Sequence, residues 1–203
     1  MTKILLTRHG HVEGIMPERF RGREPLELTP LGRRQATAIA QRIAGAFRPQ
    51  AIYTSPLGRC VETATVIAKG CGIEFLTCDE LNDIDYGTWQ FKTYAQAREL
   101  DPALFAAWFV TPQLIRFPNG DALQNVVART AAALRMILAR HPDGEVVLVG
   151  HDNVNRALLL QLLDQPLSAF WRIAQDPCCL NEIDIIDGRI LVRRINETRH
   201  LET

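Results

Sequence analysis

The sequence lacks any long apolar run, which argues against several classes of protein. The longest nearly apolar stretch, residues 103–110, is shorter than the roughly 20 residues that a membrane-spanning helix needs. The three apolar residues after Lys3 are too few for the core of a secretory signal. We therefore expect a chain that neither spans a membrane nor carries a signal peptide.

The sequence also lacks an excess of charge of either sign. Its 23 basic and 23 acidic side chains give a formal net charge of zero. Electrostatics therefore makes no case for nucleic acid or an acidic membrane surface as the main partner. Any site for an anion must be built locally, from a few arginines against a neutral background.

A CxxC pair is a third feature that is missing. The five cysteines are an odd number, and a reducing cytoplasm explains them most simply, so we expect the protein to be cytoplasmic. Adjacency of Cys178 and Cys179 would strain a disulfide, and ordinary packing is the simpler use for this pair.

Strand-like and helical patterns alternate along the 203 residues, with no repeat and no linker. This alternation predicts one domain over residues 1–203, a three-layer α/β/α sandwich with a mostly parallel central sheet and an antiparallel edge strand. Residues 79–119 are irregular, aromatic and interrupted by prolines, so we expect a lid or insertion there. The expected strands are 3–7, 51–54, 74–77 and 145–149, with a hairpin turn at Asp187-Gly188; the expected helices are 30–47, 56–69, 123–138 and about 153–163.

Three helix starts are predicted from capping residues. Thr29 and Ser55 each precede a proline, the pattern of an N-cap followed by proline at the first helical position. Asp152 or Asn153 is expected to cap the helix after the late strand.

Polar side chains follow three of the expected strands, at the point where each strand ends. If these strands are parallel, their ends lie at one edge of the sheet, where α/β proteins bind ligands. Two arginines and two histidines there predict a compact anion site. The side chains are Arg8, His9 and His11 after the first strand, Ser55 and Arg59 after the second, and His151 and Asp152 after the late strand.

For two of these residues the sequence leaves open a purely structural role as well as a role in the anion site. Arg59 falls in the first turn of its helix, where the macrodipole disfavours a cation unless an anion lies nearby; otherwise it turns outward into water. His9 is either a nucleophile or a core histidine bonded to backbone. As a nucleophile it must be neutral, and we expect Arg8 and Arg59 to lower its pKa below about 6.5. Gly10 would let the backbone approach a ligand closely.

Six short motifs occur in order along most of the chain. They are LTRHG at residues 6–10, LTPLG with QA at 28–36, SPLGR with TA at 55–64, LNDIDYGTW at 81–89, FPNGD at 117–121 and VLVGH at 147–151. In this order they resemble the motifs of the histidine phosphatase superfamily, in its phosphoglycerate mutase-like branch. One such match would be weak evidence, whereas six in the family's order are strong.

The resemblance implies a role for each matching residue. His9 would attack phosphorus and carry a phosphohistidine intermediate, and Asp83 would protonate the leaving oxygen and then deprotonate water. Arg8, Arg59 and His151 would hold the phosphoryl oxygens and neutralise the charge of the transition state. Because these side chains supply the positive charge, the resemblance implies no metal and no other cofactor.

The chain departs from the family pattern at a few positions. Asp83 stands where this branch usually has a glutamate, so either the backbone comes closer or the acid is displaced; Glu80 and Asp85 are then alternative acids. Arg21 lies where the family often contacts substrate, and His11 replaces a smaller or acidic residue. We name Arg21 and His11 as candidates for substrate binding.

The expected activity is that of a metal-independent phosphomonoester hydrolase. Its partner would be a small-molecule phosphate monoester, with a sugar phosphate or a ribazole- or nucleoside-like phosphate as examples. Between Asp83 and Gly120 only Lys92, Arg98 and Arg116 are cations, which disfavours the doubly anionic substrate of a phosphoglycerate mutase. Most of the aromatics of this segment are expected to pack the lid onto the core, and a minority to line a pocket.

Two rival functions remain open at this point. A metallohydrolase would use His9, His11, His151 and Asp152 as ligands, although the neighbouring arginines would repel a cation. A phosphate-ester-binding or regulatory protein that has lost turnover is motivated by the altered acid at Asp83. The physiological substrate, the pathway and the oligomeric state, a homodimer included, do not follow from the sequence.

Overall fold

A six-stranded sheet forms the centre of the computed structural model, which describes residues 1–202. The strand order is β3-β2-β4-β1-β5-β6, in which the first four strands are parallel and β5 and β6 form an antiparallel hairpin at one edge. The predicted mostly parallel sheet with an antiparallel edge is therefore confirmed. The strands are β1 Thr2–Arg8, β2 Pro49–Thr54, β3 Phe75–Thr77, β4 Gly144–Gly150, β5 Leu180–Ile186 and β6 Arg189–Glu197.

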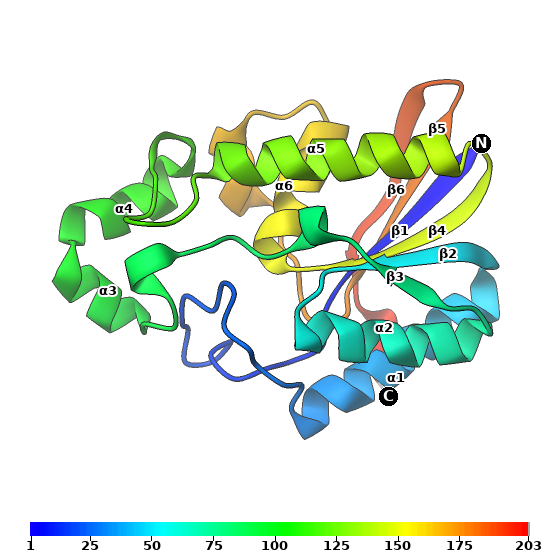
Figure 1. Ribbon diagram of the computed structural model, residues 1–203, viewed down its shortest axis with the longest axis horizontal. Coiled ribbons are helices and arrows are strands. Elements are labelled where there is room, and N and C mark those ends of the chain that lie inside the picture. Colours follow the sequence, from blue (N-terminus) through cyan, green and yellow to red (C-terminus); the bar gives the residue numbers. More distant parts are fainter. Residues whose placement is uncertain (203) are drawn as a thin grey trace.

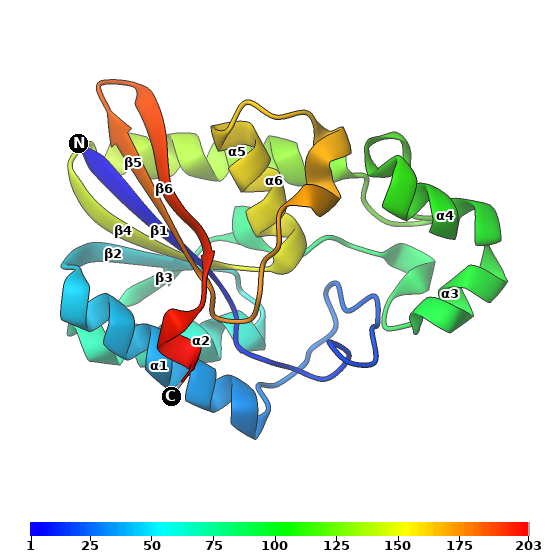
Figure 2. The same ribbon diagram turned by 180° about the vertical axis from the view of Figure 1, so that it is seen from behind.

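Helices cover both faces of this sheet, which confirms the three-layer architecture. Helices α1 and α2 pack on one face and α5 and α6 on the other (Figure 1, Figure 2). Successive residues of a strand point to opposite faces, so Leu5 packs with α1 and α2 whereas Ile4 and Leu6 pack beneath α5 and α6. The helices are α1 Pro30–Ala46, α2 Gly58–Cys71, α3 Tyr94–Leu100, α4 Pro102–Val110, α5 Leu123–Arg140 and α6 Asp152–Leu162.

One of the predicted N-caps is confirmed and one is wrong. The Thr29 hydroxyl accepts a hydrogen bond from the Gly32 amide, 3.1 Å away, and caps α1. Helix α2, however, begins at Gly58, with Leu57 in the cap position and no side-chain cap. The Ser55 hydroxyl binds the Leu57 amide and the His151 ring instead, because the strand end carries it toward that ring.

The cap predicted for the last long helix is also wrong. His151 occupies the N-cap position of α6, and Asp152 is already the first helical residue. Asn153 lies one residue further on and donates to the Tyr86 hydroxyl over 2.9 Å. The Asn153 side chain, which the local sequence pattern predicts to cap the helix, therefore bonds to Tyr86, a residue distant in the sequence.

Residues 79–119 are more regular than expected. They contain the helices α3 and α4, together with three short 3-10 turns at Asp79–Leu81, Gly87–Trp89 and Pro112–Leu114. Both helices project beyond the carboxyl ends of the parallel strands (Figure 1, Figure 2).

Aromatic side chains fix this segment to the body of the protein. Trp89, Trp108 and Phe117 are buried, as expected for most of the aromatics here. Phe20, from the loop after β1, lies at the centre of this aromatic cluster, and its ring centroid is 4.9–6.4 Å from those of five other rings.

Within residues 1–202, no helix is both long and apolar enough to cross a membrane.

Candidate active site

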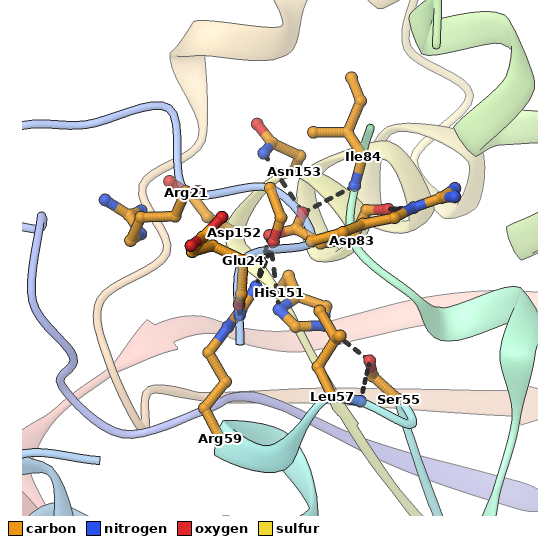
Figure 3. A network of polar contacts seen from close by, with 12 residues as sticks. Arg21, Glu24, Ser55, Leu57, Arg59, Asp83, Ile84, His151, Asp152 and Asn153 are labelled. Carbon is orange, nitrogen blue, oxygen red and sulfur yellow. Dashed lines mark hydrogen bonds and ion pairs between the residues drawn. The ribbon is translucent and has the colours of Figure 1, made fainter. Parts of the chain in front are cut away.

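The predicted strand ends meet at one edge of the sheet. Strand β4 lies between β1 and β2 and runs parallel to both. The His9 amide donates to the Gly150 carbonyl and the Ser55 amide to the Val149 carbonyl, both over 3.0 Å. These bonds continue the ladders past the strands, so the residues that follow each strand face a common space, and Figure 3 shows those that follow β2 and β4.

His9 has one ring nitrogen fixed by the backbone and one facing Arg59. Its side chain is buried, and Nδ1 lies 2.7 Å from the Gly10 carbonyl oxygen. Because a carbonyl only accepts, Nδ1 carries the proton of the neutral ring and Nε2 has the lone pair. The Arg59 Nε–H group donates to that lone pair over 3.2 Å. His9 is thus bonded to backbone through Nδ1, as the core-histidine alternative expects, while Nε2 faces Arg59 in the cluster.

Burial, more than charge, keeps His9 neutral. The pKa of His9 lies well below its usual 6.5, first because burial penalises the charged ring and then because of Arg59, His151 and Arg8. The predicted direction of the pKa shift is confirmed, but the neighbouring arginines are its secondary cause.

The structure explains glycine at position 10 by close packing of the backbone and not by the approach of a ligand. A Cβ atom there would lie 2.4 Å from the Gly32 carbonyl oxygen.

Arg59 does not turn outward into water. It is fully buried and donates to the carbonyls of Glu24 and Gly22, over 2.8 Å and 2.6 Å. Its Nη2 also lies 3.0 Å from Oδ2 of Asp83. The first turn of α2 therefore places a cation between His9 and Asp83, and two carbonyls of the loop after β1 fix its orientation (Figure 3).

Arg8 is a buried cation with unused hydrogen-bond donors. Nη1 donates to the Gln175 carbonyl over 2.6 Å and lies 3.8 Å from an Asp152 oxygen. Nε and Nη2 are buried and have no partner among residues 1–202. A buried cation normally uses its donors, so this pair of N–H groups suits an oxyanion with two oxygens.

His151 completes the cluster from the end of β4. Its Nδ1 lies 3.5 Å from Oδ2 of Asp83 and its Nε2 2.7 Å from the Ser55 hydroxyl. Its ring centroid is 5.2 Å from that of His9. The pKa of His151 is also lowered well below 6.5, chiefly by burial and then by Arg59 and Arg129.

The two lowered pKa values predict a pH dependence of stability. The unfolded chain binds these protons with the ordinary pKa of 6.5, so the contribution of each histidine is complete above 6.5 and is lost as pH falls below it. Each contributes at most about 1.4 kcal/mol per pH unit in that window. We expect Tm to fall from about pH 7 to about pH 5, and less steeply in His9→Gln than in wild type. Identical slopes in calorimetry would contradict this prediction.

Asp83 reaches the cluster despite its short side chain. It is buried, and its two oxygens contact Arg59 and His151 on one side and the Ile84 amide, 2.9 Å away, on the other. The alternative acids lie elsewhere: Glu80 is exposed and accepts from the Cys78 thiol, and Asp85 pairs with Arg23 over 3.6 Å. Of the three carboxylates, only Asp83 contacts the predicted site residues.

His11 and Arg21 border the cluster without bonding to it. His11 is half-buried and its Nδ1 lies 3.0 Å from the Thr29 hydroxyl, while Arg21 donates to the Gly14 carbonyl. The pKa of His11 is lowered by burial and then by Arg8 and Arg21, which places both arginines near it. Within residues 1–202, no group of three or more His, Cys, Asp or Glu side chains could hold a metal ion.

The sequence places Ser55 among the polar residues that follow the strands, and its hydroxyl does contact His151. Two other residues of the cluster are not predicted to lie there. Asn153, whose amide lies 3.5 Å from Asp83, is expected only as a possible helix cap, and Cys60, whose sulfur is 3.4 Å from the His151 ring, is counted only among the five cysteines. Their signal was their position beside a named residue, two after His151 and one after Arg59.

With this geometry in place, comparison with known proteins defines the class. A model described as histidine phosphatase superfamily (branch 1) matches residues 4–198, and the chain belongs to this family. It is 31% identical over 201 residues to phosphoserine phosphatase 1 of Hydrogenobacter thermophilus, covering 99% of this chain and 95% of that protein.

Solved structures agree with this assignment. The structure of Bacillus stearothermophilus YhfR superposes with a TM-score of 0.94 at 30% identity, covering all of both chains. The structure of a mycobacterial glucosyl-3-phosphoglycerate phosphatase superposes with a TM-score of 0.88 at 25% identity, covering 97% of this chain and 99% of that one.

Proposed function

We propose that the protein is a phosphomonoester hydrolase that transfers the phosphoryl group of its substrate to Nε2 of His9 and then to water. The observation that carries this proposal is the buried, neutral His9 ring, whose lone pair on Nε2 points into a cluster of cations. A neutral imidazole is a nucleophile, and flanking cations would bind the anion that it attacks.

The first half-reaction follows from the contacts within the cluster. The phosphoryl oxygens of the ester would bind the unused donors of Arg8, together with Arg59 and His151. Arg59 would exchange its contact with His9 for a phosphoryl oxygen, which frees the lone pair. Nε2 then bonds to phosphorus, the ester P–O bond breaks, and Asp83 gives its proton to the departing oxygen.

The second half-reaction returns the protein to its starting state. Water attacks the phosphorus of the phosphohistidine, and Asp83, now a carboxylate, takes a proton from it. The N–P bond breaks, inorganic phosphate leaves, and Asp83 holds the proton for the next cycle. Arg8 and Arg59 supply the positive charge throughout, so the proposal needs no metal ion.

The substrate class is a small organic phosphate monoester. Similar proteins carry names that refer to phosphoserine and to glucosyl-3-phosphoglycerate, which differ beyond the phosphate. We propose phosphoserine as the first ester to test and sugar phosphates as the second.

We further propose that residues 79–119 form a lid and that the chain is one functional domain. We also propose that the protein works in the cytoplasm, in keeping with its five free cysteines.

Hydrolysis of phosphoserine and p-nitrophenyl phosphate in excess EDTA tests the proposal. We expect turnover of both by wild type, and about a 10²-fold lower kcat for phosphoserine in Asp83→Asn, because an alkoxide cannot leave without a proton. The rate at which p-nitrophenyl phosphate phosphorylates His9 should fall less, since p-nitrophenolate leaves unprotonated. No turnover, or turnover only with added metal, would contradict the proposal, and efficient interconversion of 2- and 3-phosphoglycerate would indicate a mutase instead.

A further inference from the structure

An arginine of helix α5 binds the backbone of the segment that carries Asp83. Nη1 of Arg129 donates to the carbonyl oxygen of Glu80 over 2.9 Å and also to the carbonyl oxygen of Asn82. These two carbonyls lie three residues and one residue before Asp83. Helix α5 packs against the 3-10 turn Asp79–Leu81, so a long, regular element supports a short, irregular one.

The Arg129 guanidinium is otherwise poorly compensated. Nε and Nη2 are buried without a hydrogen-bond partner, and Arg129 forms no ion pair with any residue from 1 to 202. Burial lowers the pKa of Arg129, and the negative charges of Asp83 and Asp121 partly oppose that effect. A residue that served packing alone would not need a half-buried cation here, whereas two backbone carbonyls need a donor.

Other contacts also hold the same backbone. Nε of Arg23 donates to the Asp83 carbonyl over 3.2 Å, and the Asp83 amide donates to the Asn82 side chain over 2.9 Å. An aspartate side chain has only two rotatable bonds, so the place of its carboxylate follows the backbone closely. The contacts that fix this backbone therefore determine the position of the Asp83 carboxylate in the site.

We propose that Arg129 is a positioning residue, which fixes the Asp83 carboxylate at the reaction centre by binding the carbonyls of Glu80 and Asn82. This inference rests on the proposed function, since it assigns Arg129 to the proton-transfer step. Both hydrogen bonds of Arg129 go to backbone carbonyls, so it acts on Asp83 through the backbone. A displacement of about 1 Å in a catalytic group lowers rates by up to about 10²-fold, which sets the size of the expected effect.

The test compares two leaving groups in Arg129→Met. For phosphoserine, which needs the proton, we expect kcat to fall about 10- to 100-fold with KM within about 2-fold. For p-nitrophenyl phosphate, whose leaving group does not need the proton, the rate of the p-nitrophenolate burst that accompanies phosphorylation of His9 should change less than about 3-fold. The matched control is Arg135→Met, which removes an exposed arginine from the same helix and should leave both rates unchanged.

A second comparison links the effect to Asp83. In an Asp83→Asn background, Arg129→Met should have almost no further effect on phosphoserine turnover, because the group that it positions is gone. If Arg129→Met fails to fold, Arg129→Lys, which can bridge the two carbonyls less well, is measured for the same contrast between esters.

A fall in the p-nitrophenolate burst rate as large as the loss with phosphoserine, or additive losses in the double variant, would overturn the inference and leave the proposed function intact. Failure of wild type to hydrolyse either ester would overturn the proposed function, and this role with it.

Discussion

Replacing His9 with alanine is expected to lower kcat for p-nitrophenyl phosphate at least about 10³-fold, because the variant loses the atom that bonds to phosphorus. No other ring nitrogen can take its place: the Nε2 atom of His151 is bonded to Ser55, and its Nδ1 faces Asp83. The loss should appear in kcat, since Arg8 and Arg59 still bind the ester.

His11→Ala is the matched control, because it removes a half-buried histidine two residues away that does not contact the cluster. Its kcat should stay within about 10-fold of wild type. Thermal unfolding of both variants shows whether the cavity left by a buried side chain has destabilised the fold. A folded His9→Ala variant that keeps a tenth of the wild-type kcat would contradict the assignment of the nucleophile.

Arg59→Met is expected to lower kcat/KM about 10³-fold or more, in the range found for arginines that stabilise phosphoryl transfer. Arg59 contacts the proposed nucleophile and the proposed acid with one guanidinium, at 3.2 Å and 3.0 Å. Its loss removes charge from the transition state and also the link that orients the two groups. Affinity for vanadate, which resembles the transition state, should fall with it.

Arg33→Met provides the comparison for this variant. Arg33 lies on α1, is exposed and pairs with Glu62 over 2.6 Å, so its loss tests for a general effect of removing a cation near α2. We expect unchanged kcat/KM and vanadate affinity in Arg33→Met. Vanadate affinity that is equal in Arg59→Met and wild type would contradict a role for Arg59 in binding the phosphoryl group.

The sequence was sufficient for the fold and for the centre of the site. Alternating strands and helices predicted the layers, and polar residues at the ends of three strands predicted that Arg8, Arg59 and His151 would meet near His9. These inferences succeed because the parallel sheet turns a local pattern, a residue just after a strand, into a shared position in space.

Several of the remaining errors have one physical cause, a partner that is distant in the sequence. Ser55 and Asn153 look like helix caps locally, but His151 and Tyr86 bind them in the folded protein. The pKa of His9 depends chiefly on the burial of its ring, which only the folded protein produces. Arg129 is likewise one of several arginines on α5, and only the fold brings it to the backbone before Asp83.

Trapping the phosphoenzyme tests the central claim most directly. Wild-type protein is mixed with p-nitrophenyl phosphate, quenched in alkali, where phosphohistidine survives, and digested for mass spectrometry. The account predicts one phosphoryl group per chain, located on the ring of His9, and none in His9→Ala. A phosphoryl group on another residue, or none during steady turnover, would contradict it.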